Sequence, residues 1–303
     1  MQCSQSIRQA FQVGVVLTSL SMRAAPAFAQ ASVSGPDPNP GNLSLLGSLD
    51  AVSTYMFRGI RQHATGVALW PAAEVDAAIY SGKGNLKSVG VNIGTWNSLH
   101  TGDTGVDGPT GRLWYESDFY ATLALAFGPS TTVNTSFTAI TSPNNTFTTV
   151  KELSVKLSID DSSYLGSASL KPYGFVVFEL DTSPGVGQAD GGSKAGRYLE
   201  LGIAPGYAGS SASLSIPIKL GLSVSHYYEL NTGTVDAPLF VDHPFGYLSI
   251  AGVLTAPLGK PTGFGAWNVH AGVEFQTLGE TTKAFNGGDS HKVIVSGGIG
   301  FSY

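Results

Sequence analysis

Nine carboxylates recur along this chain at positions that share one face of an alternating pattern, which makes them candidates for ion chemistry. Side chains two residues apart on a β-strand point to the same face of the sheet. If that face lines a closed path, a ring of Asp and Glu enriches cations and repels anions. The acids are Asp50, Glu74, Asp76, Glu116, Asp118, Glu152, Glu179, Glu200 and Glu274, and the face also carries Arg58, Lys156, Lys171, Lys219 and His270.

The elements that position these residues are predicted to be β-strands. In the last strand, Val293, Val295 and Ile299 alternate with small or polar residues up to Phe301 and Tyr303, a period-two pattern. The same alternation recurs along the chain. The earlier strands are predicted near residues 43–57, 68–80, 86–96, 112–127, 131–141, 146–159, 167–180, 196–207, 212–225, 245–257 and 265–278. The facing of 245–257 stays open, because both of its faces carry apolar residues.

The links between these strands alternate in length. Links such as 97–111, 181–195 and 226–244 are long, the links that follow them are short, and 142–145 is a short exception among the long ones. Short periplasmic turns and longer outer loops are typical of outer-membrane barrels. A secreted β-sandwich or jelly roll also alternates, but here the outward faces are almost uncharged. We therefore predict an all-β, transmembrane, antiparallel up-and-down β-barrel of about 12 strands.

The N-terminal segment predicts export. Arg8, an apolar stretch from Phe11 to Met22 and the Ala27-Phe28-Ala29 sequence have the order of a secretory signal peptide, with a mitochondrial presequence as the alternative. The predicted organisation is a signal peptide at 1–29, a flexible Pro-rich and Gly-rich periplasmic lead-in at 30–42 and the barrel at 43–303. No apolar run reaches the length of a membrane helix.

Composition argues against disulfide bonds and against nucleic-acid binding. The only cysteine, Cys3, lies in the predicted signal peptide, so the mature chain has no disulfide. The chain has 16 Lys and Arg against 21 Asp and Glu, and cleavage removes two of the basic residues. An acidic protein of this kind is a poor partner for nucleic acid, which requires basic surface.

Four short motifs resemble the TorF-type porin family. The most specific runs from Tyr55 to Gln62, Tyr-Met-Phe-Arg-Gly-Ile-Arg-Gln, and is similar to the family's Tyr-x-Phe-Arg-Gly-x-x-Gln signature at the end of its first strand. Weaker matches are Gly94-Thr95-Trp96-Asn97-Ser98, Glu116-x-Asp118-x-Tyr120 and Tyr198-x-Glu200-Leu201-Gly202. The resemblance implies an outer-membrane barrel with a channel role and no known solute.

Parity and position assign roles to the residues of the first motif. Tyr55 and Phe57 are expected to face outward in an aromatic belt at the membrane interface, and Gly59 to permit a sharp turn. Arg58 is expected to face inward, either as a cation at a constriction or, with twice the weight, as half of an ion pair across the lumen.

The positions of several other aromatic and titratable residues allow two interpretations. Trp70, Trp96 and Trp114 have inward parity and either pack at the rim or, as the lesser alternative, stack against a sugar or nucleoside. His270 is expected to bond Glu274 inside the lumen rather than form a catalytic dyad. Asp103 and Asp107 are too sparse for a calcium loop, so no catalytic residue, metal or cofactor is expected.

These inferences converge on a channel in the bacterial outer membrane. We expect passive diffusion of small hydrophilic solutes or ions with a mild preference for cations. The expected partners are outer-membrane lipids and the barrel-assembly machinery, which would recognise the C-terminal strand ending in Phe301 and Tyr303. The alternative is a non-conducting barrel whose long loops bind a partner or surface ligand.

Overall fold

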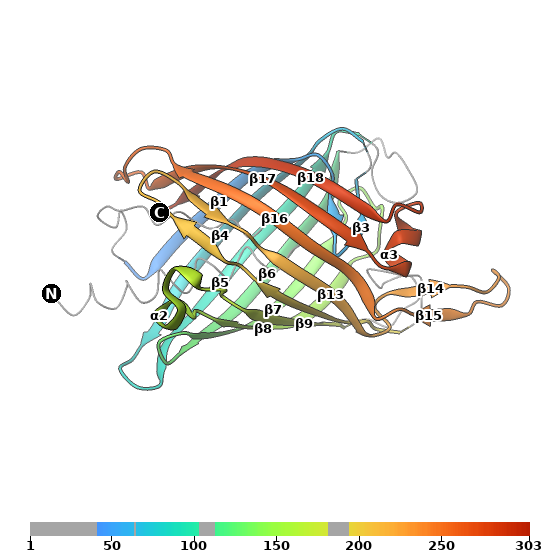
Figure 1. The fold of residues 1–303 in the computed structure, drawn as a ribbon, viewed down its shortest axis with the longest axis horizontal. Helices are drawn as coiled ribbons and strands as arrows, with labels where there is room; N and C mark the ends of the chain where they lie inside the picture. Colours follow the sequence, from blue (N-terminus) through green and yellow to red (C-terminus); the bar gives the residue numbers. More distant parts are fainter. Residues whose placement is uncertain (1–40, 64, 103–112, 181–193) are drawn as a thin grey trace.

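The computed structural model describes residues 41–63, 65–102, 113–180 and 194–303, which form one closed antiparallel barrel of twelve strand paths (Figure 1). The predicted signal peptide and most of the lead-in lie outside the described residues, as do Asp103, Asp107 and Arg112. The barrel strands are β1 (Leu43–Val52), β4 (Ala68–Ser81), β5 (Leu86–His100), β6 (Trp114–Phe127), β7 (Thr131–Thr141), β8 (Val150–Ile159), β9 (Tyr173–Glu179), β10 (Arg197–Ile203) with β11 (Gly206–Ala208), β12 (Ser213–Ser215) with β13 (Ile218–Ser225), β16 (Phe245–Pro257), β17 (Ala266–Leu278) and β18 (His291–Ser302).

The barrel closes where the first strand meets the last. β1 pairs antiparallel with β18 from Leu46 opposite Ser302 to Val52 opposite Ser296. Two backbone hydrogen bonds between Leu45 and Tyr303, at 2.7 and 2.8 Å, extend this seam to the final residue. The predicted barrel is therefore confirmed, and every strand path has a hydrogen-bonded neighbour on both sides.

Burial separates an apolar exterior from a polar interior. Outward residues such as Ile93, Phe119 and Val273 are 55–62% exposed, whereas inward Asp118 is fully buried. β16 follows the same rule, because Ile250 faces outward while its inward residues are buried, which decides the facing that the sequence left open. A strand wall that is apolar outside and polar inside is the construction of a transmembrane barrel. No helix in the described ranges is long and apolar enough to span a membrane.

Two prolines explain the two interrupted strand paths. Pro205 separates β10 from β11, and Pro217 separates β12 from β13. Proline has no N–H to donate to a ladder, but both carbonyls still accept, from the Ile216 N–H at 2.8 Å and the Ala251 N–H at 2.9 Å. β16 spans the second break by pairing with both β12 and β13, so the wall stays continuous.

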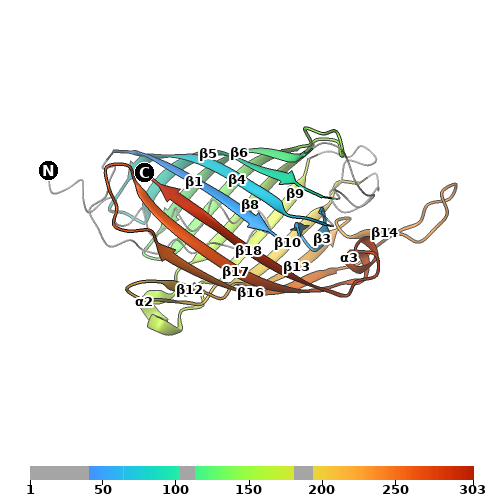
Figure 2. The same ribbon diagram turned by 90° about the horizontal axis from the view of Figure 1, so that it is seen from above.

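The two ends of the barrel differ as predicted (Figure 2). We call the end that holds the start of β1 and the end of β18 the turn end, and the opposite end the loop end. The links 82–85 and 128–130 close the turn end. The loop end carries the hairpin β14 (Glu229–Asn231) and β15 (Phe240–Asp242), and α3 (Glu280–Phe285).

One turn is longer than the sequence predicted. β9 begins at Tyr173 rather than near 167, because the preceding residues form α2 (Ser162–Leu165) and η2 (Gly166–Ala168). The Asp161 carboxylate gathers this segment by accepting from the Ser169 hydroxyl and from the N–H groups of Leu170 and Lys171. These hydrogen bonds hold the pKa of the Asp161 carboxyl below its ordinary value, and the bond from Ser169 has the largest effect. Lys171 therefore lies in a turn, which corrects its assignment to the lumenal wall.

The first strand is shorter than predicted. β1 ends at Val52, and the chain then leaves the wall to form a small hairpin of β2 (Met56–Phe57) and β3 (Ile60–Arg61). Tyr55 and Phe57 are buried at 1% and 2% exposure. The expectation that they face outward in an aromatic belt is wrong, because strand parity sets facing only while the chain stays in the sheet.

The terminal register generates a test of closure. Deleting Phe301 to Tyr303 removes the pairing of residues 45–47 with the last strand and leaves their backbone groups unsatisfied in lipid, so insertion should be lost. The measurement is the compact band on unboiled gels that becomes slower on heating, together with membrane fractionation. The control, Phe301→Ala with Tyr303→Ala, keeps the backbone pairs, and both variants are also refolded into detergent, where the predicted assembly signal plays no part. Normal insertion of the deletion would contradict the closure argument.

Candidate functional site

The hairpin between β1 and β4 lies inside the loop end of the barrel, and we call residues Met56–Arg61 the mouth hairpin. Its two-residue turn has positive φ at both positions, 47° at Arg58 and 83° at Gly59, as a tight type I′ hairpin requires. A Cβ on Gly59 would lie 3.1–3.2 Å from atoms of Tyr247 and Thr282. Glycine is therefore required here both by the backbone conformation and by the close approach of the wall.

Arg58 anchors the mouth hairpin to the opposite wall. Its guanidinium donates two parallel hydrogen bonds to the Glu152 carboxylate, at 2.7 and 2.9 Å, and a third to the Tyr227 hydroxyl at 2.7 Å. The rings of Phe57 and Tyr198 lie 4.6 and 4.7 Å from its central carbon. Arg58 and Glu152 are only 3% and 4% exposed. Of the two predicted roles for Arg58, the ion pair across the lumen is the one observed.

The backbone of the mouth hairpin is held as firmly as its side chain. The Tyr228 hydroxyl donates to the Arg58 carbonyl at 2.8 Å. The Asn286 side chain, just after α3, donates to the Gly59 carbonyl at 2.7 Å and accepts from the Arg61 N–H at 3.1 Å. Three separate loops therefore meet at this turn, one carrying the hairpin and two fixing it.

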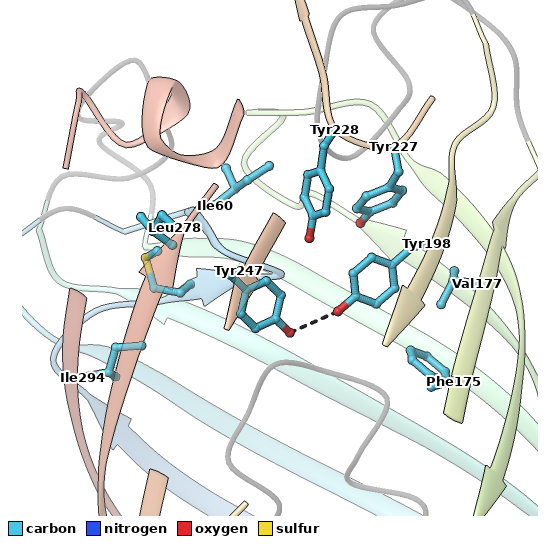
Figure 3. Close-up of a cluster of buried hydrophobic side chains, with 10 residues drawn as sticks. Ile60, Phe175, Val177, Tyr198, Tyr227, Tyr228, Tyr247, Leu278 and Ile294 are labelled. Atoms are coloured by element: carbon cyan, nitrogen blue, oxygen red, sulfur yellow. Dashed lines mark hydrogen bonds between the residues drawn. The ribbon is translucent and has the colours of Figure 1, made fainter. Parts of the chain in front are cut away.

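Tyrosines fill the space beside the mouth hairpin (Figure 3). Tyr198 and Tyr247 approach each other at 3.1 Å between hydroxyl oxygens, and both donate to the same oxygen of Glu200 at 2.8 Å. The Tyr173 hydroxyl donates to the other Glu200 oxygen at 2.7 Å. This carboxylate is thus buried with three hydroxyl donors, which is how a charged group is accommodated away from water.

A second aromatic cluster packs against the other side of the hairpin segment. Tyr55 lies 5.3 Å from Trp70 and 5.5 Å from Trp96 between ring centroids, and all three are buried. Of the two readings for these tryptophans, rim packing describes the observed arrangement. Trp114 is 48% exposed and does not face the lumen. A register shift between β5 and β6 places Tyr115 inward in its place, which the parity count missed.

The structure places the remaining predicted site residues on the inner wall. All nine acids are buried, at 7% exposure or less. Lys156 and Lys219 join them, with the Lys156 ammonium 4.2 Å from the centre of the Tyr173 ring. Because Lys171 lies in a turn, the predicted cations that do face this interior are Arg58, Lys156 and Lys219.

His270 has a different partner from the one predicted. Its Nε2 lies 2.5 Å from Asp50 Oδ1, across the seam where β1, β18 and β17 meet. Glu274 instead accepts from the Ser249 hydroxyl at 2.5 Å and from Gln276 at 2.9 Å. Asp50 and His270 are 220 residues apart, so only closure of the barrel brings them together.

The sequence analysis did not predict one pair, a serine beside a histidine, whose residue types occur in nucleophilic catalysis. The Ser98 hydroxyl lies 2.8 Å from His100 Nε2 on β5 and also accepts from the Trp70 indole at 3.0 Å. Both residues have inward parity, so the alternating pattern contained the signal. The pair is buried among the rings of Tyr115 and Trp70, where it serves as a hydrogen-bonded part of the packing.

Comparisons with known proteins found distant structural likenesses. No family model and no curated protein matches the chain, so the resemblance to TorF-type porins stays a prediction. The translocator domain of the autotransporter NalP from Neisseria meningitidis has 12% identity over 100% of this chain and 96% of that chain, with a TM-score of 0.45. The NanC porin has 12% identity over 86% and 98%, with a TM-score of 0.40. The β domain of the Bordetella autotransporter BrkA has the same identity and coverage, with a TM-score of 0.41.

The buried ion pair predicts an asymmetric mutational effect. Glu152→Ala leaves the Arg58 charge buried without its carboxylate and should lower the free energy of unfolding by about 3–5 kcal/mol. Arg58→Met combined with Glu152→Leu removes both charges and should lower it much less. Urea unfolding of the refolded protein, followed by tryptophan fluorescence, measures both variants. Equal losses would contradict an ion pair that must be kept or removed as a unit.

Proposed function

We propose that this protein is an outer-membrane channel for small hydrophilic solutes, with a mild preference for cations and a loop-end entrance that the mouth hairpin closes. The proposal includes export by a cleaved signal peptide, assembly through the C-terminal strand and no catalytic activity. The observation that carries it is the charge of the interior. Among the described residues, nine buried carboxylates face inward against the three buried cations Arg58, Lys156 and Lys219.

An interior with this excess of acids favours cations over anions. Burying a carboxylate without compensation is costly, so acids in excess require water or counter-ions beside them. A path lined in this way attracts cations and repels anions through its summed field. The preference is mild because several acids already have partners, as Glu152 has in Arg58 and Glu200 in its tyrosines.

The mouth hairpin supports a closed resting state. It occupies the loop end of the lumen with buried residues and is fixed by side chains of β8 and of two other loops. Opening the path requires breaking the Arg58 to Glu152 pair or moving the loops that hold the turn. We therefore expect low conductance in the resting protein.

A specific observation also favours a second candidate, the non-conducting barrel that binds through its loops. The β14–β15 hairpin projects away from the barrel (Figure 1), and its tip exposes Val235 at 95% and Leu239 at 61%. Exposed apolar side chains on a projecting loop are suited to contact with another surface. This candidate requires that the lumen never opens.

Conductance across a planar bilayer separates the two candidates. Replacing residues 55–62 by a Gly-Ser linker of equal length removes the side chains that pin the mouth hairpin, so conductance should rise several-fold over the resting protein. The matched control places such a linker at 232–238, on the projecting tip, and should leave conductance unchanged. Both variants must first give the heat-modifiable band. If properly inserted protein stays silent even with the 55–62 replacement, the channel proposal fails and the non-conducting candidate replaces it.

Charge selectivity is tested at Glu116 and Asp118, which lie two residues apart on the inward face of β6. Glu116→Gln with Asp118→Asn keeps shape and some hydrogen bonding, and should lower the cation preference measured as the reversal potential in a salt gradient. The difference should shrink near 1 M salt, where the screening length is about 3 Å. Asp236→Asn, on the exposed tip, is the control and should change nothing. Loss of stability with unchanged selectivity would mean that these acids brace the interior.

A further inference from the structure

The outward wall of the barrel carries two positive charges at its loop end. Lys151 is the second residue of β8 and Arg197 is the first residue of β10, and both are exposed. We call these two residues the basic pair. Within the described strand paths every acid faces inward. The outward face at the basic pair is therefore positive, with no carboxylate from the strands to balance it.

The strand register places both members of the basic pair on one patch of the wall. β9 lies between β8 and β10. Arg197 is opposite Phe178 on β9, and Phe178 is in turn opposite Leu153 on β8. Lys151 lies two residues from Leu153, so two strand spacings and one two-residue step separate the backbones of the pair by about 12 Å. The long side chains of lysine and arginine can reach one ligand across this distance.

The charges of the basic pair have no partner within the described part of the chain. Lys151 and Arg197 form no ion pair and no side-chain hydrogen bond there. Lys194, three residues before Arg197, is also exposed and has no ion pair among the described residues. Arg58, on the inside of the barrel, is by contrast fully paired with Glu152. Positive charge at this edge is therefore available to a partner outside the chain.

Apolar side chains surround the basic pair on the same face. Leu153, Phe178 and Leu180 are 39%, 38% and 51% exposed. Leu180 lies directly beside Lys151, because its N–H donates to the Lys151 carbonyl at 2.9 Å. Lysine and arginine lay their apolar stems along such a surface and extend their charged ends toward the polar side of an interface. The patch thus suits a partner that is apolar along the wall and negative at the loop end.

We propose that the basic pair binds the phosphate-bearing headgroup of a lipid in the leaflet at the loop end, which is the outer leaflet if the longer loops face outward. Only a lipid presents acyl chains to the wall and negative charge at its edge together. Arginine donates parallel hydrogen bonds to phosphate, and lysine adds a point charge. Basic residues at a membrane surface attract anionic lipids in this way. The inference goes beyond the proposed channel, since a barrel that never conducts would bind the lipid equally.

Native mass spectrometry tests the contact on the mature chain, refolded in a non-ionic detergent. The probe is lipid A, a glycolipid that carries two phosphates, and the fraction of barrel with bound lipid gives the Kd. Lipid A should bind about tenfold or more tightly than its dephosphorylated form, and equal binding of the two would overturn the proposal. Inorganic phosphate in millimolar excess should not displace the lipid, because it has no acyl chains. Displacement would mean that the pair binds free phosphate, which also overturns the proposal.

Variants decide whether the basic pair is responsible. Each basic residue at an anionic surface strengthens binding roughly fivefold, so Lys151→Gln with Arg197→Gln should weaken lipid A binding about tenfold or more. The exchange Lys151→Arg with Arg197→Lys keeps both charges and should retain binding. The matched control, Lys83→Gln with Lys87→Gln, removes two charges at the turn end and should also retain it.

Every variant must first give the compact band on unboiled gels, which shows that the barrel has folded. Removing charge from a lipid-facing wall does not oppose insertion, so the neutral variant is expected to fold. Undiminished binding after Lys151→Gln with Arg197→Gln overturns the proposal. An equal loss of binding in the turn-end control would likewise overturn it, because the effect would then follow net charge and not this patch.

Discussion

The structure depends on one constraint, that backbone N–H and C=O groups inside a bilayer have no water to bond. A sheet satisfies them only if it has no edge, so the strand that starts the barrel must pair with the strand that ends it. The β1–β18 seam meets this requirement down to Tyr303. Breaks in the wall are tolerated where a neighbour spans them, as β16 does beside Pro217. Every other feature of the molecule follows from a wall that is continuous in this sense.

Closure forces the charged side chains into a confined interior. The outward face contacts lipid and stays apolar, so the acids and their partners share the space within twelve strands. Most of the pairings that result join distant parts of the chain, such as Arg58 with Glu152 and Asp50 with His270. A buried ion pair contributes little net stability compared with apolar packing, but breaking it is expensive. These ion pairs therefore fix which side chains meet in the interior more than they add to the free energy of unfolding.

The mouth hairpin shows how this crowding acts on a loop. Its turn holds Arg58 at positive φ, which costs a residue with a side chain about 1–2 kcal/mol. The cost is offset by the Glu152 carboxylate, the surrounding rings and the hydrogen bonds from Tyr228 and Asn286. The conformation therefore depends on three loops and one strand together. A turn held from several sides is suited to a closure that opens only when those contacts are released.

The sequence by itself determined the strands, the facing of all of them except 245–257, and the set of inward acids, because alternation is local and each residue reports its own environment. It did not determine what lies beyond the sheet or across it. Tyr55 and Phe57 lie inside the barrel because the chain leaves the wall at Val52. Lys171 lies outside the lumenal wall because hydrogen bonds to the Asp161 carboxylate hold it in a turn. Trp114 faced outward because a register shift reversed parity. His270 found Asp50 rather than Glu274 because closure brings residues together that no local pattern can relate. The alternation of apolar and polar residues predicts which face of the sheet a side chain occupies, but only the closed barrel decides which other side chain it contacts there.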